Sequence, residues 1–446
     1  MIVIGGGPVG TTVASLLSEK EYQVCLFEKA KHPRFHIGES LLPMNLPILE
    51  RLGVLDQIEE VGIIKHGAEF NAVDPLTQKW KSQTFYFEKS FNKKYPYAYE
   101  VRRSEFDEIL FKNAESKGVT TFSETKVTEV NFISAGNVSV KYKKLDNDSE
   151  QVSSDNYTGE ITAKYIIDCS GRDSLLSRKL AYKQKNPTHQ SSAIFGHFDN
   201  VERREGRDEG NISIYWFEHG WFWLIPLSDG SMSVGAVCWP EYLKTLKGST
   251  EEFLWKTISM NTAVADRMKN AKSLGEVRAT GNFSYTSSKM FGQDFMLLGD
   301  AFAFVDPVFS SGVYLGMSGA EKAAEVIDQC LQQPEKAEIL CHNLESRIRS
   351  GINEMCWFIY RFTSPVMKRL FMNPSDQYQI ESAVISMLAG DIYDNPAVKW
   401  RLRFFRFIYY SYAMRMLPNV IKSWLRRKKN VAIKFAQGTM PEDKLV

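Results

Sequence analysis

The chain begins with a pattern of apolar and polar positions that is typical of a nucleotide-binding α/β fold. An apolar run, Ile2-Val3-Ile4, leads into glycines, and a helical pattern over residues 11–20 precedes a second apolar run over 23–28. Apolar runs at 165–167 and 295–298 predict further buried strands. We therefore expect a Rossmann-like core that begins at the first residues.

The rest of the chain follows two other patterns. Short strands of alternating pattern, at 192–197, 212–217 and 231–238, predict an antiparallel sheet on the substrate side. Beyond Pro334 the pattern becomes helical. The expected fold class is α/β, with a Rossmann-like domain, an antiparallel substrate-side sheet and a C-terminal helical region. The expected domains are 1–335, with the sheet interleaved at about 65–100 and 180–290, and a helical lid at 336–446.

One of these strands contains a Trp-x-Trp-x-Ile-Pro segment. Side chains alternate faces along a strand, so Trp221, Trp223 and Ile225 share one face, and Pro226 ends the ladder of hydrogen bonds. The segment predicts a bulky, rigid apolar wall. Aromatic residues at period two are also typical of an ordinary sheet core, and this interpretation stays open.

Composition restricts the classes of function. The chain has 446 residues and a formal charge of +2, which gives no general argument for nucleic acid. Six cysteines are scattered without the spacing of a disulfide framework or a zinc site, so we expect no metal and a cytoplasmic protein with reduced thiols. The start resembles no signal peptide, and no apolar stretch is long enough to span a bilayer. The first strand is short, and the expectation that a few native residues precede Met1 stays open.

The charge is unevenly distributed near the C-terminus. Residues 399–429 contain ten basic residues and no acid, interleaved with aromatic residues. One interpretation is a helical lid whose aromatic stripe packs on the core while Arg and Lys stay solvated. The other is a docking surface for an acidic carrier protein or an anionic membrane, which would make the protein peripheral to that membrane. No recognition motif for nucleic acid accompanies the charge.

The glycine-rich turn after the first strand has the chemistry of a dinucleotide site. Gly5, Gly7 and Gly10 occupy the positions that form the tight turn, let amides approach a pyrophosphate and allow close helix packing. Pro8 lies within this turn. Glu28 ends the second apolar run at the spacing that suits a ribose hydroxyl. These residues fit NAD or FAD equally well.

Later motifs favour FAD. Arg103 opens a helical pattern, Asp168-Cys169-Ser170-Gly171 follows an apolar strand, and Gly299-Asp300 closes another. Together they resemble the flavoprotein monooxygenase superfamily, in which the matching arginine and acid contact FAD. The resemblance covers most of residues 1–335. Taken singly, Arg103 could form a surface salt bridge and Asp300 a helix N-cap.

A second dinucleotide fingerprint is absent from the sequence. A dedicated NAD(P)H domain would normally require one. We therefore expect a separate flavin reductase to supply the reduced FAD.

Three segments narrow the resemblance to flavin-dependent halogenases of the pyrrole and phenol type. They are residues 32–43, which include Ser40, the Trp-x-Trp-x-Ile-Pro segment, and Asp306-Pro307-Val308-Phe309-Ser310-Ser311-Gly312-Val313. In that family, reduced FAD and oxygen convert chloride or bromide to hypohalous acid, which travels to a lysine beside the substrate. The resemblance implies that Ser40 contacts FAD and that Trp221 and Trp223 keep the substrate away from it.

The Ser-Ser-Gly turn is the candidate halide site. A halide needs amide donors and positive potential, which a turn at a helix N-terminus supplies. Ser311 and Gly312 are the expected donors, and Gly312 is also expected to contact FAD; a simple helix cap is the alternative. Tryptophan halogenases usually carry glutamate where this chain has Phe309, so free tryptophan is not the expected substrate.

Ile64-Lys65-His66-Gly67-Ala68 resembles the lysine segment of the pyrrole and phenol halogenases, in which Lys-x-Gly-Ala begins a strand. An amine can form a chloramine or hydrogen-bond hypohalous acid, and both need shelter from water. A lone lysine is usually a solvated surface charge. With the surrounding resemblance, Lys65 becomes the expected catalytic residue.

The leading hypothesis is an FAD-dependent halogenase that acts on a small, electron-rich aromatic compound, phenolic or pyrrolic, free or tethered to an acyl carrier protein. A related flavin monooxygenase, or a lipid oxidoreductase similar to geranylgeranyl reductase, is the second hypothesis. A non-enzymatic flavin-binding protein is the third.

Overall fold

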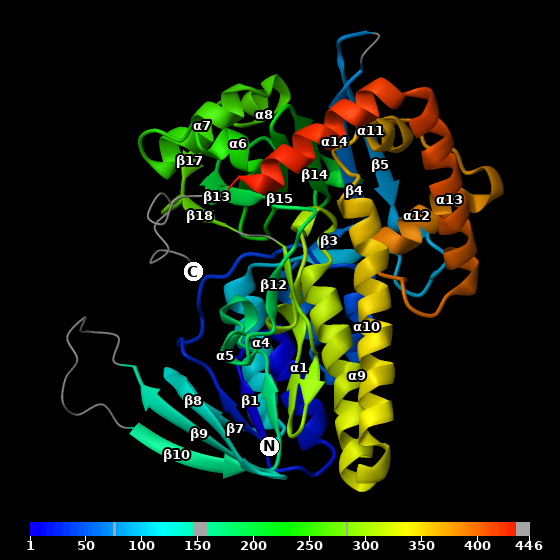
Figure 1. The fold of residues 1–446 in the computed structure, drawn as a ribbon. Coiled ribbons are helices and arrows are strands. Elements are labelled where there is room, and N and C mark those ends of the chain that lie inside the picture. The colour runs from blue at the N-terminus through cyan, green and yellow to red at the C-terminus, as the bar shows by residue number, and fades with distance from the viewer. Residues whose placement is uncertain (75–76, 146–157, 282–283, 434–446) are drawn as a thin grey trace.

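The computed structural model describes residues 1–74, 77–145, 158–281 and 284–433, and its nucleotide-binding lobe is built on a six-stranded sheet (Figure 1). The strand order is β20-β21-β11-β1-β2-β7, and all neighbours are parallel except β20 and β21. The strands are β1 (Ile2–Ile4), β2 (Cys25–Phe27), β7 (Thr120–Phe122), β11 (Ile166–Asp168), β20 (Phe291–Gly292) and β21 (Phe295–Leu297). The predicted apolar runs therefore do assemble into one Rossmann-like sheet.

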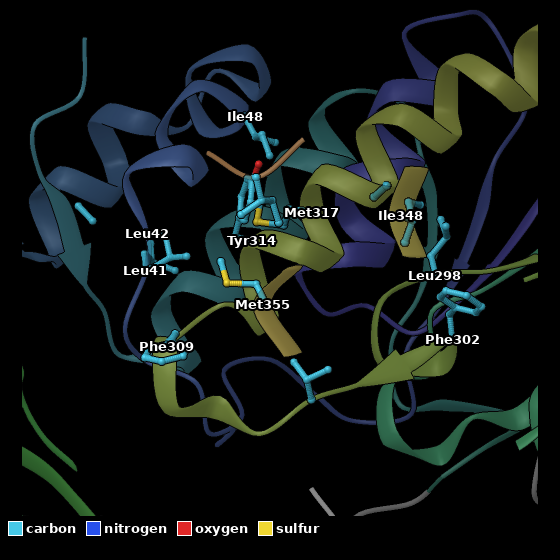
Figure 2. Close-up of a cluster of buried hydrophobic side chains, with 14 of the residues drawn as sticks. Leu41, Leu42, Ile48, Leu298, Phe302, Phe309, Tyr314, Met317, Ile348 and Met355 are labelled. Atoms are coloured by element: carbon cyan, nitrogen blue, oxygen red, sulfur yellow. The ribbon is translucent and has the colours of Figure 1, made fainter. Parts of the chain in front are cut away.

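Helices cover this sheet. Helix α1 (Pro8–Ser18) packs between α4 (Arg103–Ser116) and α9 (Gly312–Gln332), and α10 (Ala337–Ile359) runs along α9 (Figure 1). Figure 2 shows the apolar core around α9, with Tyr314 and Met317 among side chains from other segments. Helix α1 begins three residues before the predicted Thr11, because Pro8 at the first helical position is pre-organised for helix.

The second large sheet has the strand order β17-β13-β16-β15-β14-β4-β5, with β18 paired to β13. Its strands are β4 (Gly67–Val73), β5 (Trp80–Tyr86), β13 (Ser192–Asp199), β14 (Ile212–Phe217), β15 (Gly220–Pro226), β16 (Met232–Cys238), β17 (Lys272–Ser273) and β18 (Arg278–Thr280). The sheet was expected to be antiparallel, but β4 and β14 pair in parallel. They can do so because they come from distant segments rather than from one hairpin.

The two faces of this sheet have different partners. Phe222 and Leu224 of β15 face a cluster formed with α6 (Pro240–Leu243), α7 (Thr250–Ser259) and α8 (Thr262–Arg267). Trp221, Trp223 and Ile225 belong to the main core on the opposite face. The alternation predicted for this strand is therefore confirmed, and the tryptophans face the nucleotide-binding lobe.

Smaller elements complete the described chain. A three-stranded antiparallel sheet, which the sequence analysis did not predict, extends from the lower left of Figure 1. Its strands are β8 (Thr125–Ser134), β9 (Asn137–Lys144) and β10 (Thr158–Ala163). The other short elements are α2 (Leu46–Leu52), α3 (Leu55–Val61), α5 (Leu175–Lys179), β3 (Ile63–Lys65), β6 (Ala98–Glu100), β12 (Lys183–Lys185), β19 (Tyr285–Ser287) and β22 (Ala303–Phe304).

The C-terminal region is helical, as predicted. Its helices beyond α10 are α11 (Pro365–Met372), α12 (Ile380–Leu388), α13 (Pro396–Arg415) and α14 (Leu417–Ala432). The proposed domain boundary at residue 335 falls in the turn between α9 and α10, which pack together. Within the described ranges, no helix combines the length and apolarity needed to cross a bilayer.

Candidate active site

A cavity of about 1140 Å³ opens beside the carboxyl end of β1. Its walls come from segments far apart in the sequence, and they include most of the residues predicted to bind the cofactor. These are Gly5, Gly7, Pro8, Glu28, Arg103, Asp300 and Gly312. Basic side chains outnumber acidic ones on the walls, so the cavity suits an anionic ligand such as a pyrophosphate.

The three glycines of the turn have separate roles. Gly5 has φ +103°, and a Cβ there would overlap the carbonyl of Cys169. A Cβ at Gly10 would overlap the carbonyl of Gly5, so Gly10 allows the helix to pack closely and does not line the cavity. Gly7 faces the cavity and has no backbone atom near its missing Cβ. A ligand can therefore approach the backbone at Gly7.

The Glu28 carboxylate is held beside this turn. It accepts hydrogen bonds from the amide of Gly6 at 2.6 Å and the amide of Ala30 at 2.9 Å. Arg34, whose importance the sequence analysis missed, lies 3.6 Å from Glu28 and 3.3 Å from Asp107. These contacts fix the acid at the edge of the cavity, where a ribose hydroxyl would meet it.

Arg103 and Asp300 also line this cavity. Arg103 is buried and forms a bidentate salt bridge with Asp107 at 2.7 and 2.9 Å, so a solvated surface pair is excluded. Burial, with Arg103 nearby, lowers the pKa of His36 to about 3 and keeps its ring neutral. Burial also raises the pKa of Asp300 to about 6. Together with the glycine turn, these groups suit the binding of FAD in the cavity.

The predicted halide turn lies at the start of α9. Ser310 has φ +56°, and Ser311 precedes the first helical residue, Gly312. The Ser311 hydroxyl is buried, makes no capping hydrogen bond and has no partner among the described residues. The first amides of a helix have no intrahelical acceptor, so this turn offers amide donors next to the cavity wall that Gly312 forms, whereas Ser311 itself does not line the cavity.

Lys65 is buried, which excludes a solvated surface charge at this position; it is 1% exposed and ends β3. Its ammonium group donates to Ser40 Oγ at 2.6 Å and to the Leu41 carbonyl at 3.1 Å. Glu100 Oε1 lies 3.7 Å from Lys65 Nζ. Lys65 and Ser40 do not line the large cavity; they form a separate enclosed cluster with Glu100.

Burial dominates the electrostatics of this cluster. It lowers the pKa of Lys65, and the carboxylate of Glu100 opposes that change. Burial likewise raises the pKa of Glu100 to about 8, against the effect of Lys65. A low pKa increases the fraction of Lys65 that is a neutral amine, which is the nucleophilic form.

The tryptophan wall stands close to the large cavity. The rings of Trp221 and Trp223 lie 5.9 Å apart. Phe195 lies 5.9 Å from Trp223 and 6.2 Å from Phe35, which lines the cavity. The ring of Trp221 lies 6.3 Å from that of Phe362, which does not line this cavity. Phe195 and Phe35 therefore connect Trp223, but not Trp221, to the cavity wall.

Gly235 on the neighbouring strand makes room for this wall. A Cβ at Gly235 would overlap the ring of Trp223, which stands opposite it in the register. Gly235→Val should therefore destabilise the protein by about 1–3 kcal/mol through overpacking. Urea denaturation measures this, with Gly319→Ala as control because its Cβ would make an ordinary 3.5 Å contact with Ile348. Equal stability of the two variants would contradict the packing.

A second buried polar cluster lies beside Trp221, in a cavity of about 10 Å³. His189 Nε2 lies 2.8 Å from Asp306 Oδ2, and the hydroxyl of Ser191 donates to the same oxygen at 2.7 Å. In the sequence, Asp306 stands out only as part of its motif. His189 does not stand out, because an isolated histidine in sequence has no partner to identify it.

The fold and the cavity define an FAD-binding flavoprotein. A sequence profile of the tryptophan halogenase family matches residues 1–87 and 72–366, and the chain belongs to this family. It is therefore a flavin-dependent halogenase, which is an FAD-dependent oxidoreductase that uses halide as a substrate.

Individual relatives agree with this assignment. The 1H-pyrrole-2-carbonyl-(peptidyl-carrier protein) chlorinase of Pseudomonas fluorescens is 30% identical over 420 residues, which are 90% of this chain and 90% of the relative. A flavoprotein/dehydrogenase structure from Cytophaga hutchinsonii has a TM-score of 0.81 and 28% identity, over 93% of this chain and 98% of that one. The myxobacterial chondrochloren halogenase has a TM-score of 0.74 and 31% identity, over 91% and 89% of the two chains.

Proposed function

We propose that this protein halogenates an electron-rich aromatic compound, phenolic or pyrrolic, either free or attached to an acyl carrier protein, and that Lys65 directs the halogen. The observation that supports this proposal most is the burial of Lys65. It counts because the chain belongs to a family of halogenases. The substrate class is supported by a relative named as a chlorinase of a carrier-bound pyrrole. Phe309, where tryptophan halogenases usually have glutamate, argues against free tryptophan.

The cofactor residues hold FAD in the large cavity. Gly5, Gly7 and Pro8 receive the pyrophosphate, and Glu28 receives the ribose. Arg103 and Asp300 lie further along the same wall. When bound, reduced FAD together with oxygen supplies the oxidising equivalents that convert a halide ion to an electrophilic halogen.

The remaining residues separate the halide from the aromatic substrate. Ser311 and Gly312 hold chloride or bromide with amide and hydroxyl donors at the start of α9. Trp221 and Trp223 keep the substrate away from the flavin. A neutral Lys65 amine then takes halogen from hypohalous acid as an N–halogen bond and releases water, or holds the acid by a hydrogen bond. Shelter from solvent prevents loss of the reactive halogen.

Two partners follow from this proposal. The chain has a single dinucleotide fingerprint, so a separate flavin reductase supplies reduced FAD. A carrier protein brings the substrate if that substrate is tethered, as the name of the Pseudomonas relative indicates for that protein. Halogenation is favoured over plain hydroxylation and over alkene reduction because the chain belongs to the halogenase family.

Glu100→Gln tests the state of the Lys65 amine. The carboxylate of Glu100 raises the pKa of Lys65, so its removal lowers that pKa further. The neutral amine then persists at lower pH, and the acidic limb of the pH profile of halogenation should move to lower pH. The measurement is the rate of product formation against pH, with Glu88→Gln, an exposed acid, as control. An unchanged or raised acidic limb would contradict the role of Lys65.

A further inference from the structure

Helix α14 presents its apolar face to solvent. Its outward-facing residues Leu417, Ile421, Trp424 and Leu425 are 52%, 46%, 57% and 53% exposed. Their spacing of four, three and one residues places them on one side of the helix. An amphipathic helix on a globular protein normally turns this side to the core.

Polar contacts hold α14 in this orientation. Asn430 is fully buried and accepts a hydrogen bond from the amide of Glu241 at 2.9 Å. Lys429 forms an ion pair with Glu241 at 2.7 Å, and Arg426 lies 3.1 Å from the His219 ring. The polar face is therefore the side that docks on the protein body, and the outward apolar face follows from these contacts.

Helix α13 extends the apolar surface. Its buried row, Val398, Leu402, Phe405 and Tyr409, packs on the core, as the lid interpretation required. The lid interpretation does not account for a second row of large apolar residues on α13, because that row faces solvent. This exposed row is Trp400, Phe404, Phe407, Tyr410 and Met414. We call these residues, together with the outward residues of α14, the C-terminal ridge; α13 lies at the right of Figure 1 and α14 crosses the upper part of the view.

The C-terminal ridge is strongly basic. No acid occurs between residues 395 and 433, which contain ten basic residues. Lys422 and Lys428 have no ion-pair partner among the described residues, and both are exposed. Exposed apolar side chains scattered singly need no explanation, whereas several of them on one helix face, flanked by positive charge, mark an interaction surface.

We propose that the C-terminal ridge binds an anionic lipid surface. Trp, Leu, Ile, Phe and Met side chains enter the boundary between headgroups and acyl chains, while Lys and Arg contact the headgroups. A second copy of this chain is disfavoured, because two basic surfaces repel each other. An acidic protein would match the charge, but protein interfaces anchor such side chains in fitted pockets. A bilayer accepts exposed apolar side chains of any spacing.

The experiment is sedimentation of the full chain with vesicles of phosphatidylcholine, alone or mixed with phosphatidylglycerol. We expect binding to the mixed vesicles, little binding to phosphatidylcholine alone, and weakening by salt. The variant Ile421→Glu/Trp424→Glu should lower the partition coefficient by at least about tenfold. Ile339→Glu on α10, where Ile339 is 65% exposed, is the matched control and should bind as the parent does.

Other outcomes would overturn the lipid assignment. They are equal binding by the Ile421→Glu/Trp424→Glu variant, concentration-dependent self-association that this variant abolishes, and binding to an acidic carrier protein but not to vesicles. The variant should keep FAD binding and halogenation of a free substrate, because its residues lie outside the large cavity. A lost vesicle interaction is thus distinguishable from a failure of the proposed function.

Discussion

Lys65→Met is expected to lower halogenated product by at least about 1000-fold while oxygen and NADH consumption by the reconstituted system continue. In the proposed function the amine acts after the flavin has reacted, so its loss should leave the earlier steps intact. Methionine fills a similar volume and carries no amine. Product is measured by mass spectrometry, which identifies chlorine or bromine by isotope pattern. Oxygen and NADH consumption are followed in the same reaction.

Three further variants separate chemistry from folding. Removing one partner of a buried ion pair can destabilise a protein by about 3–5 kcal/mol, so Lys65→Met is also made with Glu100→Gln. Lys65→Arg should fail too, because a guanidinium stays protonated. Lys94→Met, which changes an exposed lysine paired with Glu50, should keep full activity. Substantial halogenation by the folded Lys65→Met variant would show that Lys65 has only a structural role.

Gly7→Val is expected to raise the dissociation constant for FAD at least about a hundredfold, equivalent to about 2.7 kcal/mol. The valine side chain would project into the cavity where the pyrophosphate must approach the backbone. Gly7 has φ −79° and ψ −176°, which valine adopts without strain. The apoprotein should therefore keep its thermal stability, and FAD titration measures the loss. Unchanged FAD affinity in this variant would show that the glycine turn is not part of the cofactor site.

The sequence predicted the elements whose chemistry is local. The Gly5 to Gly10 turn, the acid at Glu28 and the alternation of Trp221 and Trp223 each depend on neighbouring residues. Backbone periodicity is enough to determine such features. The same holds for the helical C-terminal region.

Features that depend on long-range pairing could not be predicted. The parallel pairing of β4 with β14 joins segments that begin at Gly67 and Ile212, and no local pattern encodes it. Glu100 reaches Lys65 only because β6 pairs with β3. The outward apolar face of α14 is a similar case, since Asn430 and Lys429 find their partners on the α6 segment.

The environment of Lys65 connects fold to function. A solvated lysine is almost entirely protonated at neutral pH, and a protonated amine cannot accept halogen. Burial beside Ser40 and Leu41 lowers the pKa of Lys65, while Glu100 prevents an isolated charge in the interior. The neighbouring carboxyl group therefore opposes the effect of burial on the pKa of this amine.

Reconstitution of the complete reaction from purified components distinguishes halogenation from hydroxylation. The purified chain is incubated with FAD, a flavin reductase, NADH, oxygen, bromide and a panel of phenols and pyrroles, and products are analysed by mass spectrometry. We expect a monobrominated product with the isotope doublet of bromine, absent when bromide or the chain is omitted. Hydroxylated products alone, with NADH consumed and no brominated species from any member of the panel, would contradict it.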